Sequence, residues 1–191
     1  MLNNIKNLSL TKKLVYKIVF FIFCLIPFFS GLDSIPPWDR DESRFVQSTY
    51  QMIETNDYIN IKFLDEIRAK KPIGIYWAQS FFANIFGEDK ISSYRYVSTL
   101  GALITILILW KFSQILFGQK ATLFVVSASM ISLLFIFESH VAKTDTLLLS
   151  LITLQQFLLL KIILNKEKSI LFDLIMPISM WLVLGIGFLI K

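Results

Sequence analysis

The sequence predicts an all-α, polytopic membrane protein, and three observations support this fold class. Hydrophobic residues make up 55% of the 191 residues, and the mean hydropathy is +0.63, both above the values of an ordinary soluble domain. The apolar residues gather in runs of about 20, the length that a helix needs to cross a hydrocarbon core about 30 Å thick. Most of the charges lie between these runs. We therefore expect several membrane-spanning helices joined by polar connections.

Five transmembrane helices are expected, at about residues 14–32, 96–117, 121–137, 146–164 and 170–190. Pro27 and Pro177 lie inside two of these runs, which helices in lipid tolerate when neighbouring groups satisfy the freed carbonyl oxygen. The first run resembles a secretory signal, but no small-x-small cleavage motif follows it. We therefore expect an uncleaved signal anchor.

Lysines in the short connections predict the orientation of the chain. If all five runs cross the membrane, the N-terminal tail and the second and fourth connections lie on one side, and their lysines are Lys6, Lys12, Lys13, Lys17, Lys111, Lys120, Lys161, Lys166 and Lys168. That side is expected to be cytoplasmic. The loop 33–95, the turn 138–145 and Lys191 are then expected on the periplasmic face of a bacterial inner membrane.

Composition also argues against two other classes of protein. The formal charge of +5 would suit a nucleic-acid partner, but the basic residues are scattered between apolar runs, so no nucleic-acid binding is expected. Cys24 is the single cysteine, so the sequence offers no disulfide and no cysteine-based metal site.

The loop 33–95 contains two stretches with helical periodicity. Apolar residues recur every three or four positions over 42–54 and again over 72–86, so we expect two amphipathic helices lying along the outer leaflet. Pro72 fits the first turn of the second helix, and Gly87 fits its end. Between the helices, residues 56–71 are expected to form an exposed connection.

That connection ends in a basic group, Arg68, Lys70 and Lys71, just before the second helix. Basic side chains at a helix N-terminus can receive a phosphate through their charge and through free backbone N–H groups. A solvated basic loop, or one attracted to anionic lipid in general, is the alternative.

Two further charged clusters are expected on the same face. Opposite charges are dense over 39–44, and the turn 138–145 holds Glu138, His140, Lys143 and Asp145. Ionisable residues next to a membrane are costly to bury, so they more often serve a function than not. The two clusters therefore favour a polar site at the membrane surface. Ordinary solvated loop charges remain the alternative, and His140 is either structural or part of the site.

A series of short motifs follows in order along residues 30–191: Asp41-Glu42-x-Arg44-Phe45, Met52-Ile53-Glu54-x-x-Asp57-Tyr58, Lys71-Pro72-x-x-x-Tyr76-Trp77, Phe86-Gly87, Tyr94-Arg95, Leu116-Phe117-Gly118 and Lys143-Thr144-Asp145. The series resembles the N-terminal half of the ArnT-like and protein O-mannosyltransferase superfamily. Members of that superfamily are membrane-embedded glycosyltransferases with the GT-C fold. The resemblance implies transfer of a sugar from a polyprenyl-phosphate donor to the hydroxyl of a lipid, glycan or protein acceptor.

By this resemblance, Asp41 is the candidate general base or acceptor-orienting carboxylate, with Glu42 supporting it. A hydroxyl is a poor nucleophile until a carboxylate within hydrogen-bond reach takes its proton. Asp145 matches a second acidic position, where it would orient the sugar or a cationic side chain; an N-cap for its helix is the alternative. Arg44 and Lys71 match positions that contact the leaving phosphate. The remaining candidate substrate contacts are Lys70, Tyr76 and Lys143.

One position departs from the family pattern. Lys70 stands where aminoarabinose transferases have a glutamate implicated in metal binding, and an amine cannot replace a carboxylate as a ligand for a hard cation. No metal site and no cofactor are therefore assigned. Lipid A and aminoarabinose are not transferred to this chain as acceptor and donor.

The resemblance also suggests that the chain is the N-terminal part of a longer protein, because residues 185–191 resemble the end of the family's fifth span. The alternative is a small, non-catalytic membrane protein that binds polyprenyl phosphate or anionic lipid. A transporter or channel subunit is less favoured, because the ionisable groups cluster at one face and not at mid-membrane.

Overall fold

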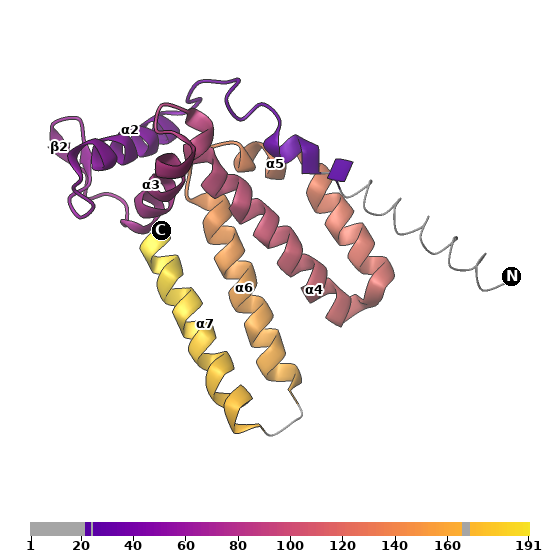
Figure 1. Ribbon diagram of the computed structural model, residues 1–191. Helices are drawn as coiled ribbons and strands as arrows, with labels where there is room; N and C mark the ends of the chain where they lie inside the picture. The colour runs from indigo at the N-terminus through magenta and orange to yellow at the C-terminus, as the bar shows by residue number, and fades with distance from the viewer. Residues whose placement is uncertain (1–21, 24, 166–168) are drawn as a thin grey trace, which may run out of the picture.

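The computed structural model describes residues 22–23, 25–165 and 169–191 (Figure 1). Its regular elements are α2 (Arg40–Thr55), β1 (Lys62–Phe63), β2 (Glu66–Ile67), α3 (Gly74–Phe86), α4 (Ile91–Ile131), α5 (Leu133–Ser139), α6 (Asp145–Leu164) and α7 (Ile170–Ile190). The predicted all-α class is confirmed, since strands occupy only four of the described residues.

Three of the described helices, α4, α6 and α7, are long and apolar enough to cross a membrane. α4 packs against α6 and α6 against α7, and Figure 1 shows α6 and α7 side by side. Few residues in the most apolar stretches of α6 and α7 are buried within the chain, as expected for helices that face lipid. Most of the predicted span 14–32 lies outside the described residues; residues 22–23 and 25–29 are helical.

The predicted spans 96–117 and 121–137 form the two arms of α4, which reverses direction at Gly118 (Figure 1). Gly118 has φ 78° and ψ 179°, a conformation that residues with a Cβ rarely adopt. The continuous helix expected over 121–137 is wrong, because the chain becomes extended at Ser132 before α5 begins. The second arm, 119–131, is about 20 Å long at 1.5 Å per residue, shorter than a bilayer core.

The two amphipathic helices expected in the loop 33–95 are confirmed as α2 and α3. Asp39 caps α2 by accepting a hydrogen bond from the backbone N–H of Asp41. The end of α3 at Gly87 is confirmed, with φ 106° at that glycine. Pro72 was expected in the first turn of α3, and this is wrong because the helix begins at Gly74.

The first residue of α3, Gly74, packs closely against the end of α7. A Cβ built on Gly74 would lie 2.6 Å from the carbonyl oxygen of Leu189, so only glycine allows this approach. α3 also shares a core with α2 and the beginning of α4, and the buried members of this core are Phe45, Met52, Ile61, Ile75, Tyr76 and Val97. This core fixes α2 and α3 at one end of the apolar helices.

The connection between α2 and α3 is more ordered than expected. It contains a short antiparallel hairpin in which Lys62 pairs with Ile67 and Phe63 with Glu66. Gln51 of α2 bonds both the N–H and the carbonyl of Leu64, which has a positive φ of 56°. The hairpin is therefore tied to α2 by side-chain bonds that sequence periodicity does not reveal.

The loop 33–95, the turn 138–145 and the C-terminal end of α7 meet at the same end of the molecule. Asp33 bonds the backbone and hydroxyl of Ser92, and the hydroxyl of Ser98 bonds the carbonyl of Val141. Lys191 pairs with Asp145 at 2.6 Å. The predicted grouping of these segments is confirmed, whereas the side of the membrane on which they lie stays a prediction.

Candidate functional site

A charged pocket of about 260 Å³ lies where the start of α2, the hairpin and the approach to α3 meet. Its charged lining residues are Asp41, Arg44, Glu66, Arg68, Lys70 and Lys71, and two apolar side chains complete the wall. Four predicted site residues are thus brought together, although α2 and the Lys70–Lys71 pair are separated by the whole hairpin. We refer to this cavity as the cationic pocket.

Asp41 and Arg44 lie one turn apart at the beginning of α2. An Arg44 guanidinium nitrogen is 3.6 Å from a carboxylate oxygen of Asp41, and the side chains are 33% and 53% exposed respectively. The Asp41 carboxylate is therefore accessible to an incoming hydroxyl. Arg44 is partly held in place beside it.

Arg68 also lines the cationic pocket, and its guanidinium is fixed from three sides. Its Nε donates to the hydroxyl of Tyr76 at 2.9 Å. Its Cζ lies 5.4 Å from the ring centre of Phe45 and 5.9 Å from that of Phe63. Such cation–π contacts favour one orientation of the guanidinium plane. Arg68 belongs to the basic group that the sequence predicts as a phosphate-binding group, but the family motifs do not include it.

Tyr76 lies beneath the cationic pocket and does not line it. The side chain is fully buried, its ring packs 5.5 Å from Phe45, and its hydroxyl is occupied by Arg68. Burial raises the pKa of this hydroxyl above its ordinary value of 10.0, against the opposing effect of Arg68. The structure therefore gives Tyr76 contact with Arg68, whereas a direct substrate contact stays a prediction.

Glu42 is fully buried next to the exposed Asp41. Its two oxygens accept from the Nε and Nη2 of Arg95 at 2.8 and 3.2 Å, and from the backbone N–H groups of Ala142 and Trp38. With both oxygens occupied, Glu42 is arranged to hold structure and not to receive a proton from a substrate.

Arg95 completes this buried cluster from α4. Beyond Glu42, it donates to the carbonyl oxygens of Leu32, Ile35 and Pro36. The Arg95 guanidinium therefore connects α4 to the start of α2 and to the chain that leads into α2. Glu42 in turn connects this cluster to the turn after α5 through the backbone N–H of Ala142. The sequence motif contained Arg95, but its partners are too distant along the chain for spacing to identify them.

Lys143 and Asp145 lie at the same end of the molecule but do not line the cationic pocket. Lys143 forms an ion pair with Asp39, the residue that caps α2. Asp145 is the first residue of α6 and pairs with Lys191, so it is not the N-cap considered as an alternative; the capping position is Thr144. The predicted site residues are thus divided between the cationic pocket and two ion pairs outside it, Asp39–Lys143 and Asp145–Lys191.

The ion pair between Asp39 and Lys143 shifts both groups toward their charged forms. The hydrogen bond from Lys143, followed by the Asp41 backbone N–H, lowers the pKa of Asp39 below 3.8. Burial acts to lower the pKa of Lys143, but the hydrogen bond and charge of Asp39 outweigh it and raise that pKa above 10.5. Both groups are charged at neutral pH.

His140 connects the first helical segment to α5. Its Nε2 lies 3.1 Å from the carbonyl oxygen of Ser30, and its Nδ1 lies 2.8 Å from that of Ile136. The structure thus gives His140 the structural contacts considered for it. It also lines a second, mostly apolar cavity of about 590 Å³ together with Trp38 and Phe137.

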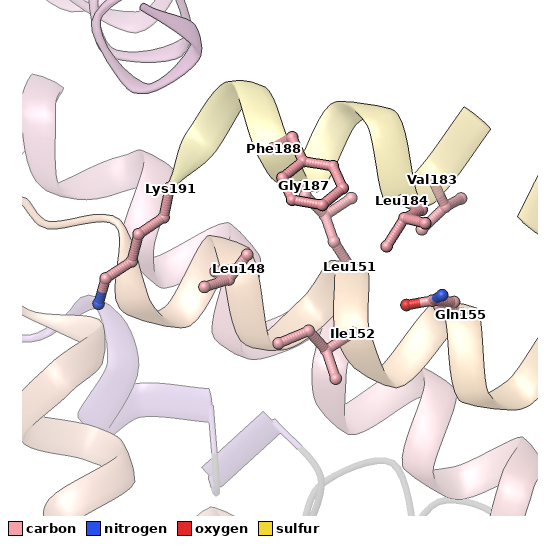
Figure 2. A pocket seen from close by; sticks show the side chains of 9 residues that line it. All are labelled: Leu148, Leu151, Ile152, Gln155, Val183, Leu184, Gly187, Phe188 and Lys191. Atoms are coloured by element: carbon pink, nitrogen blue, oxygen red, sulfur yellow. The ribbon is translucent and has the colours of Figure 1, made fainter. Parts of the chain in front are cut away.

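An apolar cavity of about 180 Å³ lies between α6 and α7, and Figure 2 shows its side chains. Leu148 and Leu151 come from α6, and Phe188 comes from α7. Lys191 stands at one end of this cavity, where it reaches Asp145. Apart from Gln155 and Lys191, the side chains that line this cavity are apolar.

The described residues contain no group of three or more His, Cys, Asp and Glu side chains arranged to hold a metal ion. The carboxylates of the cationic pocket, Asp41 and Glu66, share it with four cations. The argument from Lys70 against a metal site stays a prediction.

Similar proteins were identified at the levels of sequence and structure. Residues 70–191 match the family described as dolichyl-phosphate-mannose-protein mannosyltransferase. An undecaprenyl phosphate-alpha-4-amino-4-deoxy-L-arabinose arabinosyl transferase of Aeromonas hydrophila is 29% identical over 118 residues, covering 62% of this chain and 21% of the relative. A protein of the same name from Pectobacterium atrosepticum is 24% identical over 190 residues, covering 97% of this chain and 32% of the relative.

The fold is similar to that of ArnT from Cupriavidus metallidurans. The crystal structure of its apo state superposes with a TM-score of 0.84 at 19% identity, covering 94% of this chain and 33% of that one. The structure bound to undecaprenyl phosphate gives the same score and covers 92% of this chain and 32% of that one. The chain spans a fifth to a third of the length of these proteins. It is a polytopic membrane protein that belongs to the dolichyl-phosphate-mannose-protein mannosyltransferase family.

Proposed function

We propose that this chain is part of a membrane glycosyltransferase that moves a sugar from a polyprenyl-phosphate carrier to an acceptor hydroxyl. The observation that supports this proposal best is the cationic pocket, which places the exposed Asp41 among four cations at one end of the apolar helices. A carboxylate and several cations are the two kinds of group that this transfer needs. The acceptor is a lipid, a glycan or a protein.

The proposed reaction uses the two kinds of group in one step. Asp41 takes the proton of the acceptor hydroxyl, whose oxygen forms a bond to the anomeric carbon of the sugar. The bond between that carbon and the phosphate oxygen breaks, and its electron pair goes to the phosphate. The phosphate gains a negative charge as the sugar leaves, so Arg44, Arg68, Lys70 and Lys71 stabilise the transition state more than the bound donor.

The other predicted residues take supporting roles in this proposal. Asp145, 46% exposed and paired with Lys191, remains the candidate for orienting the sugar. Lys143 and Glu42 hold the start of α2, and with it Asp41, through Asp39 and Arg95. No metal is assigned to the reaction, because Lys70 places an ammonium group in the cationic pocket.

The comparisons support the choice of donor. The relatives are named undecaprenyl phosphate-alpha-4-amino-4-deoxy-L-arabinose arabinosyl transferases, and one solved ArnT structure is bound to undecaprenyl phosphate. We propose a lipid-linked donor of this type for the intact protein, in a bacterial inner membrane with the cationic pocket on the periplasmic side. Which sugar it moves is left open, as in the sequence prediction.

The experiment is sugar transfer from a polyprenyl-phosphate donor by the intact gene product carrying Asp41→Asn. Loss of a general base lowers turnover by about a hundredfold to ten-thousandfold, and the amount of folded protein in the membrane should not change. Glu54→Gln is the matched control, because Glu54 is an exposed carboxylate on the same helix but does not line the cationic pocket.

Unchanged turnover in the Asp41→Asn variant would remove Asp41 from its role. Binding of the polyprenyl phosphate by wild-type protein without any sugar transfer would favour the non-catalytic lipid-binding alternative.

A further inference from the structure

We propose that Arg68 binds the carrier phosphate in the cationic pocket and that the buried Tyr76 is the positioning residue that aims it. The inference deepens the proposed function and rests on it. It singles out Arg68 from the predicted basic group as the cation that fixes the geometry of the phosphate, and it replaces a direct substrate contact by Tyr76 with an indirect one. Three observations lead to it.

The first observation is that Arg68 is held in place before any ligand arrives. Tyr76 occupies its Nε, and the rings of Phe45 and Phe63 lie against the guanidinium. Within the described part of the chain, no hydrogen bond or ion pair engages its two terminal nitrogens. These nitrogens form the planar fork that matches two phosphate oxygens, and a fixed fork loses little conformational freedom on binding.

The second observation is that Arg68 is better fixed than the other cations of the cationic pocket. Arg44 shares its charge with Asp41 at 3.6 Å. Lys70 is exposed and Lys71 is partly exposed, and both carry flexible side chains with a point charge. Arg68 is therefore the cation that can bind the phosphate in a defined geometry, whereas the lysines add electrostatic attraction.

The third observation is the balance of charge in the cationic pocket. Four cations and two carboxylates leave an excess of two positive charges. A phosphate monoester carries a charge of about −1.5 to −2 at pH 7, so the carrier phosphate released after transfer matches this excess. The donor, a phosphate diester with one negative charge, matches it less well. The cationic pocket is complementary to the charge that the phosphate acquires as the sugar leaves.

Tyr76 acts in this proposal only by holding Arg68 and not by contacting the carrier. Its side chain is fully buried and packs against Phe45, so its ring cannot reach the carrier. Its hydroxyl accepts the hydrogen bond from the Nε of Arg68. Removing that hydroxyl leaves the packing of the ring intact and frees the guanidinium to turn.

The experiment measures how tightly the intact protein, in lipid nanodiscs, binds undecaprenyl phosphate compared with undecaprenol, the uncharged alcohol of equal length. The wild-type protein should prefer the phosphate. Arg68→Gln should weaken phosphate binding by about tenfold to a hundredfold, and Arg68→Lys should recover only part of it because the ammonium lacks the fork. Binding of the alcohol should stay constant in all variants.

Tyr76→Phe tests the positioning role. It should weaken phosphate binding in the wild-type background and have no further effect when Arg68→Gln is already present, because Tyr76 acts only through Arg68. Lys62→Gln is the matched control, since Lys62 is an exposed cation of the same hairpin that does not line the cationic pocket. It should leave the preference unchanged.

Wild-type phosphate preference that survives Arg68→Gln would overturn the assignment of Arg68. An equal effect of Tyr76→Phe with and without Arg68 would overturn the positioning role. If Arg68→Gln does not fold, the phosphate preference of Arg68→Lys and Tyr76→Phe tests the proposal instead. Arg68→Lys preserves the positive charge, and Tyr76→Phe preserves the aromatic ring. Wild-type protein that binds phosphate and alcohol equally would instead contradict the proposed function itself.

Discussion

At the scale of single residues, Asp41 and Glu42 show how neighbours in the chain receive opposite roles. One residue along a helix turns the side chain by about 100°, because a turn contains 3.6 residues. Asp41 consequently faces the cationic pocket, whereas Glu42 is buried against Arg95. The sequence motif named both acids as one catalytic pair. The structure separates an accessible carboxylate from one whose oxygens are already occupied.

The ion pair between Asp39 and Lys143 predicts how stability changes with pH. The folded-state pKa of Asp39 lies below 3.8, so its contribution is complete above that value and is lost as the pH falls through the lowered pKa. The folded-state pKa of Lys143 lies above 10.5, so its contribution is complete below that value and is lost as the pH rises through the raised pKa.

We therefore expect Asp39→Asn to lower the melting temperature by a constant amount between about pH 5 and pH 9. The difference from wild type should shrink as the pH falls from 3.8 through the lowered pKa of Asp39, where the folded wild-type carboxylate becomes protonated. The amide retains a capping oxygen for α2, so the loss reflects the ion pair. Thermal melts in detergent across this pH range measure it.

Asp65→Asn is the control for this pH series, since Asp65 is an exposed carboxylate in the hairpin turn without an ion pair among the described residues. A difference between Asp39→Asn and wild type that persists unchanged at pH 3 would contradict the assignment to the ion pair.

At the scale of elements, close helix contacts depend on glycines placed at particular turns. A Cβ on Gly101 of α4 would lie 2.7 Å from backbone atoms of Thr146 and Leu147 at the start of α6. Backbone atoms cannot turn away as a flexible side chain can. The start of α6, and with it Asp145, is thus set by the absence of a side chain on α4.

We expect Gly101→Ala to destabilise the folded protein by about 1–3 kcal/mol, because the added methyl group forces α4 and α6 apart. Unfolding in mixed detergent micelles measures the change. Gly185→Ala on α7 is the matched control, because nothing lies within 4 Å of its ideal Cβ in the described structure. That control should be neutral or stabilising by up to about 1 kcal/mol, the helix advantage of alanine. Equal losses in the two variants would contradict the role of close packing.

Hydrophobic periodicity predicted some of these elements and missed others. The apolar stripes predicted α2 and α3 because each helix buries one face in the same core. The hairpin was missed because two-residue strands have no period to detect, and it is held by Gln51 from another element. The break at Ser132 was missed because no proline or glycine marks it.

At the scale of the whole molecule, the cationic pocket and the turn 138–145 share one end of the bundle because the helices alternate in direction. The Glu42–Arg95 cluster and the ion pair of Lys143 join segments that lie 53 and 104 residues apart. The reversal of α4 at Gly118 lies at the opposite end of the long helices (Figure 1). A membrane separating these ends would leave the two ion-pair clusters on the same face.

This arrangement predicts a labelling pattern in a Cys24→Ser background. Asp65→Cys and Asp145→Cys should react with a membrane-impermeant maleimide applied from the periplasmic side, and Gln119→Cys should react only in inverted vesicles. Labelling is measured by the mass added to the intact protein. Reaction of positions 65 and 145 from opposite sides would contradict both the orientation and the shared site.

The sequence by itself determined the class of protein and most of its helices. Apolar runs of membrane-crossing length and helical stripes depend on residues close together in the chain, and the charged motifs identified Asp41, Arg44, Lys70 and Lys71 before any contact was known. Tertiary structure alone decided which of these groups meet, since contacts between distant segments leave no periodic trace. Only folding buries Glu42 against Arg95 and Tyr76 beneath Arg68, because burial is set by packing between elements and not by the chain's local pattern.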